Sequence, residues 1–261
     1  MPAASLSPRF PLSSEVPIGD AAYPAEAVLE TLVPYLSDRR RARLEAVVAA
    51  RTFSVLPVLE RVHDPGNLNA VLRSAEGLGY GAAAFVDLQG DARRAREAPE
   101  DEEGASDRRM QIRASQGAHK WVDATDHASA EAFAVWARAR GYRIAVTALR
   151  ADARPIAEWD FSAPTALVMG AEHEGASGAM LELADAALLL PLDGFVQSYN
   201  VSVAAALGLY HARADRLART GRHGDLSAGE ARLLLAHYAA RAVPLAAPLM
   251  AHAAARTSGG G

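Results

Sequence analysis

The chain has no cysteine. This absence excludes disulfides, thiolate metal ligands and a cysteine nucleophile. The chain also has no run of about 18 uninterrupted apolar residues, the length that a membrane-spanning helix needs. Its first 30 residues contain one arginine, several prolines and no apolar stretch of the kind found in secretion signals, so we expect a cytoplasmic protein.

The chain also has no excess of basic over acidic residues. The formal net charge is −4 and the pI about 6.1, so any RNA binding has to come from local patches rather than from bulk attraction. What the chain does have is apolar sequence, since 50% of its 261 residues are hydrophobic. That is enough to bury the core of one large domain with small additions.

The middle of the chain alternates between two patterns. Short apolar runs bounded by turn residues predict buried strands, and amphipathic stretches that end at glycine predict helices. Buried strands alternating with helices indicate an α/β fold with a mostly parallel sheet. The predicted strands lie in 55–62, 81–88, 120–124, 142–149, 165–170 and 186–192, and the predicted helices in 67–79, 129–141 and 201–212.

Both ends of the chain differ from this middle part. Residues 1–24 are rich in Pro, Ser and Ala and predict an irregular arm, whereas 25–50 predict helix and 229–256 an extra helix. The acidic stretch 96–109 predicts a solvated loop, and the Gly-rich tail a mobile end. We therefore expect an N-terminal arm with a helical RNA-binding extension over 1–54, a central domain over 55–215, and a C-terminal helical extension with its tail over 216–261.

A basic cluster lies in the first helical region. Its spacing fits a solvated helix face, and it also fits a phosphate-binding patch. The residues are Arg39, Arg40, Arg41, Arg43 and Arg51.

Three further segments carry unusual polar residues at predicted strand ends, where ligands collect in α/β sheets. The first has a turn with Asn67 as a plausible helix cap, followed by Arg73. The second is a strand that runs into Gly170, Glu172, His173 and Glu174, and ligands this close in sequence rarely converge on one metal, so we expect no metal site. The third places Gln197, Ser198, Tyr199 and Asn200 before an apolar helix, which Ser198 or Asn200 could cap.

In this order, the three segments resemble the motifs of the SpoU/TrmH branch of the SPOUT RNA methyltransferases, over about residues 38–215. Within that branch, 39–67 and 113–123 look most like the subgroup that methylates the 2′-oxygen of tRNA. The matching residues are Asn67 with Arg73-Ser74, Gly170-x-Glu172-x-x-Gly175, and Pro191, Gly194 and Ser198-x-Asn200-Val201-Ser202-Val203-Ala204.

The resemblance implies a deep trefoil knot in the C-terminal part of the domain, a pocket for S-adenosylmethionine built by that knot, and a homodimer with catalytic residues shared across its interface. By position, the pocket residues would be Thr147, Gly170, Leu190, Leu192 and Tyr199. Tyr199 departs from the leucine usual in the family, which matters if its ring points inward. A pocket lined by main chain also explains small residues at Gly170 and Gly194.

The resemblance further implies transfer of a methyl group from S-adenosylmethionine to a ribose 2′-hydroxyl of RNA. Arg73 would lie nearest that hydroxyl. An arginine keeps its proton at neutral pH, so it suits holding a phosphate or stabilising a developing alkoxide better than abstracting a proton. Asn67 would bond near it, while Glu172, Ser198 and Asn200 would organise the pocket.

The preferred RNA substrate is the D-loop guanosine of tRNA. A ribosomal RNA ribose methyltransferase is the alternative within the class, although the helical N-terminus differs from the small α/β domain that many of those carry. A non-catalytic RNA-binding paralogue is the alternative outside it. RNA contacts are expected from Arg39, Arg40, Arg41, Arg43 and Arg51 and, beside the acidic stretch, from Arg108, Arg109, Arg113 and Lys120.

Overall fold

The computed structural model describes residues 6–97, 117–172 and 174–258. The chain divides into two compact units. One spans Thr52–His223, and the other combines Met1–Arg51 with Gly224–Gly261. We describe each unit by itself.

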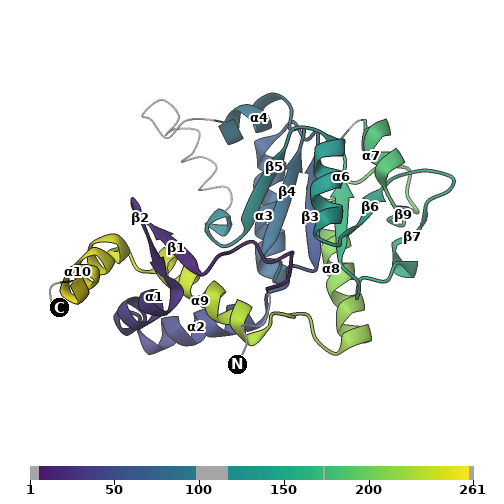
Figure 1. The fold of residues 1–261 in the computed structure, drawn as a ribbon. Helices are drawn as coiled ribbons and strands as arrows, with labels where there is room; N and C mark the ends of the chain where they lie inside the picture. Colours follow the sequence, from purple (N-terminus) through teal and green to yellow (C-terminus); the bar gives the residue numbers. More distant parts are fainter. Residues whose placement is uncertain (1–5, 98–116, 173, 259–261) are drawn as a thin grey trace. The chain divides into compact units, whose positions relative to one another are not determined.

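A seven-stranded sheet forms the centre of the Thr52–His223 unit, in the order β5-β4-β3-β8-β6-β9-β7 (Figure 1). All its strand pairings are parallel, as the alternating pattern predicts. The order reverses direction beside β3, so the carboxyl ends of β3 and β8 flank a crevice of the type in which α/β proteins bind ligands. The strands are β3 (Val55–Glu60), β4 (Ala82–Val86), β5 (Asp123–His127), β6 (Arg143–Thr147), β7 (Arg154–Pro155), β8 (Thr165–Met169) and β9 (Ala186–Leu189).

Helices cover both faces of this sheet (Figure 1). One core cluster joins the strands to α3 and α8, through residues such as Leu72 and Leu209, and the other joins them to α6 and α7. The helices of this unit are α3 (Pro65–Leu78), α4 (Gly90–Glu97), η2 (Ala118–Lys120), α6 (Ala130–Ala139), η3 (Ile156–Glu158), α7 (Gly178–Leu183) and α8 (Val201–Thr220).

Helix boundaries follow local chemistry, with one correction to the sequence prediction. The cap of α3 is Asp64, whose carboxylate accepts from the Gly66 N–H (2.8 Å), so the prediction of Asn67 as cap is wrong. Asp64 fits because Pro65, which has no N–H, then takes the first helical position. The helix ends at Gly79, whose φ of 91° suits glycine. Asn200 caps α8, as one of the two predicted candidates.

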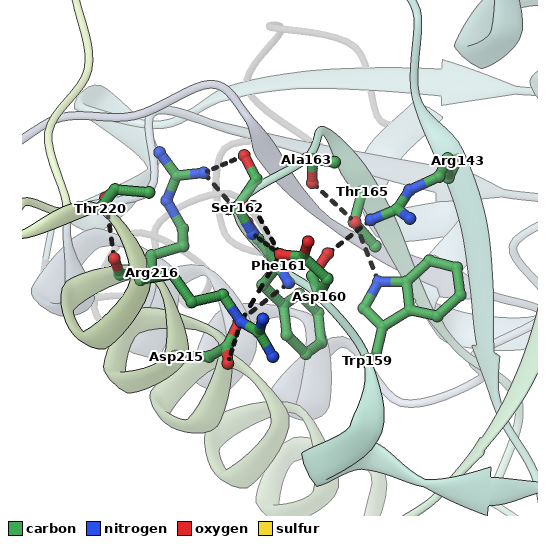
Figure 2. A network of polar contacts seen from close by, with 11 residues as sticks. Arg143, Trp159, Asp160, Phe161, Ser162, Ala163, Thr165, Asp215, Arg216 and Thr220 are labelled. Carbon is green, nitrogen blue, oxygen red and sulfur yellow. Dashed lines mark hydrogen bonds and ion pairs between the residues drawn. The ribbon is translucent and has the colours of Figure 1, made fainter.

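A buried polar network fixes the end of α8 at the amino edge of the sheet (Figure 2). Arg216 is 3% exposed and donates to the carbonyl of Phe161 (3.1 Å) and to that of His223 (3.4 Å). Asp215 accepts from the Phe161 N–H (3.0 Å), and Asp160 accepts from the Ser162 N–H (2.8 Å). We call Asp160, Phe161, Ser162, Asp215 and Arg216 the anchor cluster.

The second unit joins the two ends of the chain. Its core packs residues of α1, such as Val28 and Leu32, with Ala236 and Ala239 of α9. Ser227 and Glu230 form a capping box at the start of α9. The elements are β1 (Glu15–Ile18), β2 (Ala21–Pro24), α1 (Ala25–Leu32), η1 (Val33–Tyr35), α2 (Asp38–Ala49), α9 (Ala228–Ala242) and α10 (Ala246–Ser258).

Several boundaries differ from the sequence prediction. The predicted irregular arm contains the antiparallel hairpin of β1 and β2, in which short strands pair around Gly19 with its φ of 63°. The extra helix expected over 229–256 is two helices, since Pro244 lies at the break and cannot donate a helical hydrogen bond. Most of the acidic stretch 96–109 lies outside the described residues, and its first two residues end α4.

No single described helix is long and apolar enough to cross a membrane. The pair α9 and α10 passes by length and composition only together, and it is bent by 114° at the break.

Candidate functional site

A cavity of about 390 Å³ lies at the carboxyl ends of β6, β8 and β9. All five residues predicted to bind the cofactor line it: Thr147, Gly170, Leu190, Leu192 and Tyr199. They come from three strand ends and from the loop before α8, so the fold brings together residues up to 52 positions apart in the sequence. A cavity of this volume, lined by both apolar and polar residues, is typical of a small-molecule site.

Gly170 ends β8 where two stretches of backbone come very close. A Cβ atom there would lie 2.1 Å from the Ala176 nitrogen and 2.2 Å from the Gly175 carbonyl carbon. The loop turns back on itself after this residue, because Ala171 and Gly175 exchange backbone hydrogen bonds of 3.1 and 2.9 Å. Glycine is therefore required at position 170. Gly194, by contrast, has no heavy atom within 4 Å of an added Cβ, so space does not require a glycine there.

Three of the predicted catalytic residues form one hydrogen-bonded chain, which we call the site cluster. Asn67 donates from Nδ2 to Oε1 of Glu172 (2.6 Å), and Asn200 donates from Nδ2 to Oδ1 of Asn67 (3.2 Å). Asn200 also accepts from the Ser202 N–H (2.9 Å) and so caps α8 with the same side chain. The cluster joins the first turn of α3 and the loop after β8 to the start of α8, and Glu172 lines the cavity.

The loop before α8 supplies the remaining wall of the cavity. Ser198 lines it and is exposed, and its hydroxyl makes no hydrogen bond with any residue that the structure describes. Tyr199 donates from its hydroxyl to the carbonyl of Pro191 (2.9 Å). Its ring therefore ties the two ends of the 191–199 loop together while contributing to the lining.

Arg73 stands apart from these residues. It lies on an exposed face of α3 and is not among the described residues lining the cavity. Within the described part of the chain, its guanidinium has no hydrogen-bond or ion-pair partner. It lies six residues after Asn67, about 9 Å further along the helix and on a different face. The structure thus separates Arg73 from the site cluster of its own chain.

The predicted RNA-binding arginines of α2 are exposed, with one correction outside the helix. Arg41 pairs with Glu45 (2.9 Å). Arg51, which follows α2, is 1% exposed and donates to the Tyr238 hydroxyl (3.1 Å), so its inclusion in the basic patch was wrong. Its burial in a core explains this, because an arginine stem packs well beside an aromatic ring.

The other residues predicted to contact RNA lie outside α2. Lys120 is exposed in η2. Arg108, Arg109 and Arg113 lie outside the described residues.

Two charged residues that were not predicted to bind the cofactor also line the cavity. Arg150 follows β6 and forms a two-point contact with Asp152 (2.8 and 3.0 Å). Glu174 lies in the loop after β8 and pairs with Arg61 (2.9 Å). The available signal was position, since both follow strands whose carboxyl ends meet at this edge of the sheet. The cavity thus presents two carboxylates and one guanidinium to a ligand.

Known proteins share both the sequence and the fold. Residues 54–210 match the sequence profile of the SpoU rRNA Methylase family. A tRNA (guanosine(18)-2′-O)-methyltransferase of Thermus thermophilus is 38% identical over 181 residues, which cover 69% of this chain and 85% of the relative.

Solved structures agree with this match. The TrmH/SpoU tRNA modifying enzyme of Aquifex aeolicus is similar with a TM-score of 0.65 and 27% identity, over 79% of this chain and 98% of that one. The SpoU methyltransferase AviRb of Streptomyces viridochromogenes, in complex with AdoMet, is similar with a TM-score of 0.52 and 25% identity, over 62% and 60%. Since the profile matches more than half of the chain, this protein belongs to the SpoU rRNA methylase family.

Proposed function

We propose that this protein methylates a ribose 2′-hydroxyl of RNA with S-adenosylmethionine, and that its preferred substrate is a D-loop guanosine of tRNA. The observation that carries the proposal is the convergence of three separate motifs on one cavity, with Asn67, Glu172 and Asn200 hydrogen-bonded together beside it. The relative from Thermus thermophilus, by its name, modifies guanosine 18 of tRNA, which favours the same substrate here.

The cavity suits S-adenosylmethionine. Its volume of about 390 Å³ lies within the range for small-molecule sites, and leucine side chains such as Leu188 and Leu190 provide apolar walls for an adenine ring. The carboxylates of Glu172 and Glu174 favour the positive charges of the sulfonium and amino groups, and Arg150 favours the carboxylate. When bound, the cofactor supplies an activated methyl group on sulfur.

The protein's own residues then have to position the ribose and stabilise the negative charge that develops on its 2′-oxygen. The O–CH3 bond forms as the S–CH3 bond breaks, S-adenosylhomocysteine is released, and the hydroxyl proton leaves to solvent or to a basic group. Arg73 would hold the adjacent phosphate or stabilise the developing alkoxide, because a guanidinium donates readily and does not accept protons. Asn67 and Glu172 fix each other's orientation, Asn200 holds the end of the 191–200 loop through its bond to Asn67, and Ser198 offers a hydroxyl with no partner among the described residues to the pocket.

A homodimer would explain why Arg73 is separate from the site cluster, since Arg73 of one subunit could then serve the pocket of its partner. The exposed side of α8 supports this arrangement. Val203, Leu207 and Tyr210 are 46%, 44% and 63% exposed and fall on one helical stripe. We further propose that 190–200 is the knot loop of the family's trefoil knot, with 201–212 as the helix that follows it.

RNA contacts are proposed for Arg39, Arg40, Arg41 and Arg43, with Arg113 and Lys120. Three of the α2 side chains, those of Arg39, Arg40 and Arg43, are exposed and pair with no residue in the described ranges. Because tRNA is the proposed substrate, the proposed location is the cytoplasm.

The deciding experiment supplies labelled S-adenosylmethionine with unmodified total tRNA and, in parallel, ribosomal RNA, and then maps the ribose-methylated nucleotide. Label at a D-loop guanosine is the expected result. Label confined to ribosomal RNA keeps the reaction and changes the substrate. Binding of both cofactor and RNA without transfer to either would overturn the catalytic proposal in favour of an RNA-binding paralogue.

Replacement of Arg39, Arg40 and Arg43 by glutamine tests the RNA-binding surface. Each lost phosphate contact should reduce the slope of log affinity against log salt by about 0.7 to 0.9, so three contacts should reduce it by roughly 2. Arg256→Gln, an exposed arginine on α10, is the control. A salt slope equal to that of the control variant would identify α2 as a solvated face only.

A further inference from the structure

Backbone strain marks two residues at the carboxyl edge of the sheet. Arg61 follows β3 with a φ of 56°, and Asp87 follows β4 with a φ of 45°. In the described ranges they are the only non-glycine residues with positive φ. Residues other than glycine, asparagine and aspartate rarely adopt this conformation, so it is most unusual for Arg61, and such strain concentrates at functional sites. The contacts of these two side chains are therefore candidates for a functional role.

Arg61 lies between two carboxylates. Its Nη1 atom is 2.9 Å from Oε2 of Glu174, and its Nε atom is 3.8 Å from Oδ2 of Asp87. The guanidinium presents several donors in one rigid plane, so it can face both carboxylates at once, which a single ammonium does less well. The side chain of Arg61 is 31% exposed and that of Glu174 is 61% exposed, so the pair lies largely at the surface.

Glu174 belongs to the loop that lines the cavity after β8. This loop is held at three points by residues of one short stretch of sequence. Asn67 binds Glu172 (2.6 Å) and Arg61 binds Glu174 (2.9 Å). At the far end, Glu60 accepts from the Ser177 N–H (2.9 Å) and hydroxyl (2.6 Å). Arg61 supplies the middle point.

We propose that Arg61 is a positioning residue for methyl transfer, acting through Glu174 to hold the 171–177 loop so that Glu172 meets Asn67 at the cavity. The inference rests on the proposed function for its catalytic readout. An ion pair of this exposure contributes little to overall stability. A shift of about 1 Å in a catalytic group, however, can slow a reaction by about 100-fold. Loss of Arg61 should therefore affect the rate far more than the stability.

The first test is single-turnover methyl transfer by Arg61→Gln at saturating cofactor. We expect a rate at least 10-fold lower, with the dissociation constant for S-adenosylhomocysteine within about threefold and an unchanged melting temperature. Arg61→Gly keeps the backbone conformation at no steric cost but removes the side chain, so it should be equally slow. Arg94→Gln, which breaks the exposed pair with Asp91 on α4, is the control and should keep the native rate.

A double-mutant cycle of Arg61→Gln with Glu174→Gln tests whether Arg61 acts through Glu174. If Arg61 acts through Glu174, the double variant should be no slower than the slower single variant. Additive losses, or a native rate in Arg61→Gln, would overturn the proposal.

Hydrogen exchange keeps this test separate from that of the proposed function. Amides of 171–177 should exchange several times faster in Arg61→Gln than in the unaltered chain or in Arg94→Gln, whether or not any RNA is methylated. An inactive unaltered chain refutes the proposed function, whereas unchanged exchange in Arg61→Gln refutes the role of Arg61.

Discussion

Each edge of the central sheet carries a polar cluster. The cluster at the amino edge is centred on a buried arginine, and the cluster at the carboxyl edge lies beside a cavity. At the amino edge, the anchor cluster is built on Arg216, which is 3% exposed and bonded to main-chain carbonyls. At the carboxyl edge, the site cluster of Asn67, Glu172 and Asn200 lies beside a cavity. In the described part of the chain, the side chains of Ser198, which lines this cavity, and of Arg73, further along α3, have no partner.

This difference distinguishes residues that stabilise the fold from residues that are available to bind a ligand. Buried side chains that hydrogen-bond to main-chain groups hold a fold together, and removing one leaves its partners unpaired. Side chains held in place but with unused donors and acceptors are available to a ligand. Helix α8 links the two clusters, since Asn200 caps its start and Arg216 lies near its end. Changes at the two edges should therefore have different effects, on activity at one and on folding at the other.

The largest effect is expected from Gly170→Ala. The added Cβ would meet main-chain atoms of Gly175 and Ala176 at 2.2 Å or less, so the 171–176 loop must move and the cavity must change shape. We expect cofactor binding, measured by calorimetry, and methyl transfer to be lost. Gly194→Ala, in the loop before α8, is the matched control, because the new methyl group meets no atom within 4 Å. Equal affinity in the two variants would contradict the steric argument.

Arg73→Ala should abolish most methyl transfer without affecting the cofactor. Loss of one charge-stabilising donor typically lowers kcat by about 100- to 1000-fold. The cofactor dissociation constant should remain unchanged, since Arg73 is not among the described residues that line the cavity. Weakened cofactor binding in this variant would assign Arg73 to the pocket instead. Mixing Arg73→Ala with an inactive pocket variant should restore activity if residues are shared across a dimer.

The sequence predicted the sheet and the membership of the cavity more successfully than it predicted pairwise contacts. Strand ends were readable because buried parallel strands are short apolar runs, whereas the cavity residues Thr147, Gly170 and Leu190 were assigned by position from the resemblance to the SpoU/TrmH branch. The bond between Asn67 and Glu172 joins residues 105 positions apart and depends on strand order, which no local pattern contains. Arg51 was misread because a basic residue beside others suggests a surface, whereas its aromatic partner lies 187 positions away.

At the other edge, Arg216→Met should lower stability and leave the site intact. The main-chain carbonyls of Phe161 and His223 would lose a charged donor inside the protein, at a cost of roughly 2–3 kcal/mol. Urea denaturation followed by circular dichroism would measure this loss. Cofactor affinity of the folded protein should stay native. Arg219→Met, which removes a half-exposed ion-pair partner of Asp215 on the same helix, should cost less, about 1 kcal/mol.

The smallest effect is expected from Asp160→Asn, and it depends on pH. Hydrogen bonds from the Ser162 hydroxyl and N–H hold the pKa of the Asp160 carboxyl below its ordinary value of 3.8. A carboxyl with a lowered pKa stabilises the folded state above pH 3.8, and this contribution is lost as the pH falls through the folded-state pKa. Because the group is exposed, the difference from Asp160→Asn at pH 7 should be less than about 1 kcal/mol. Urea denaturation at pH 7, 5 and 3 should show that difference persisting to pH 5 and shrinking below. A difference that grows on acidification would mean that Ser162 does not stabilise the charged carboxylate, and the amino-edge cluster would then depend on Arg216 alone.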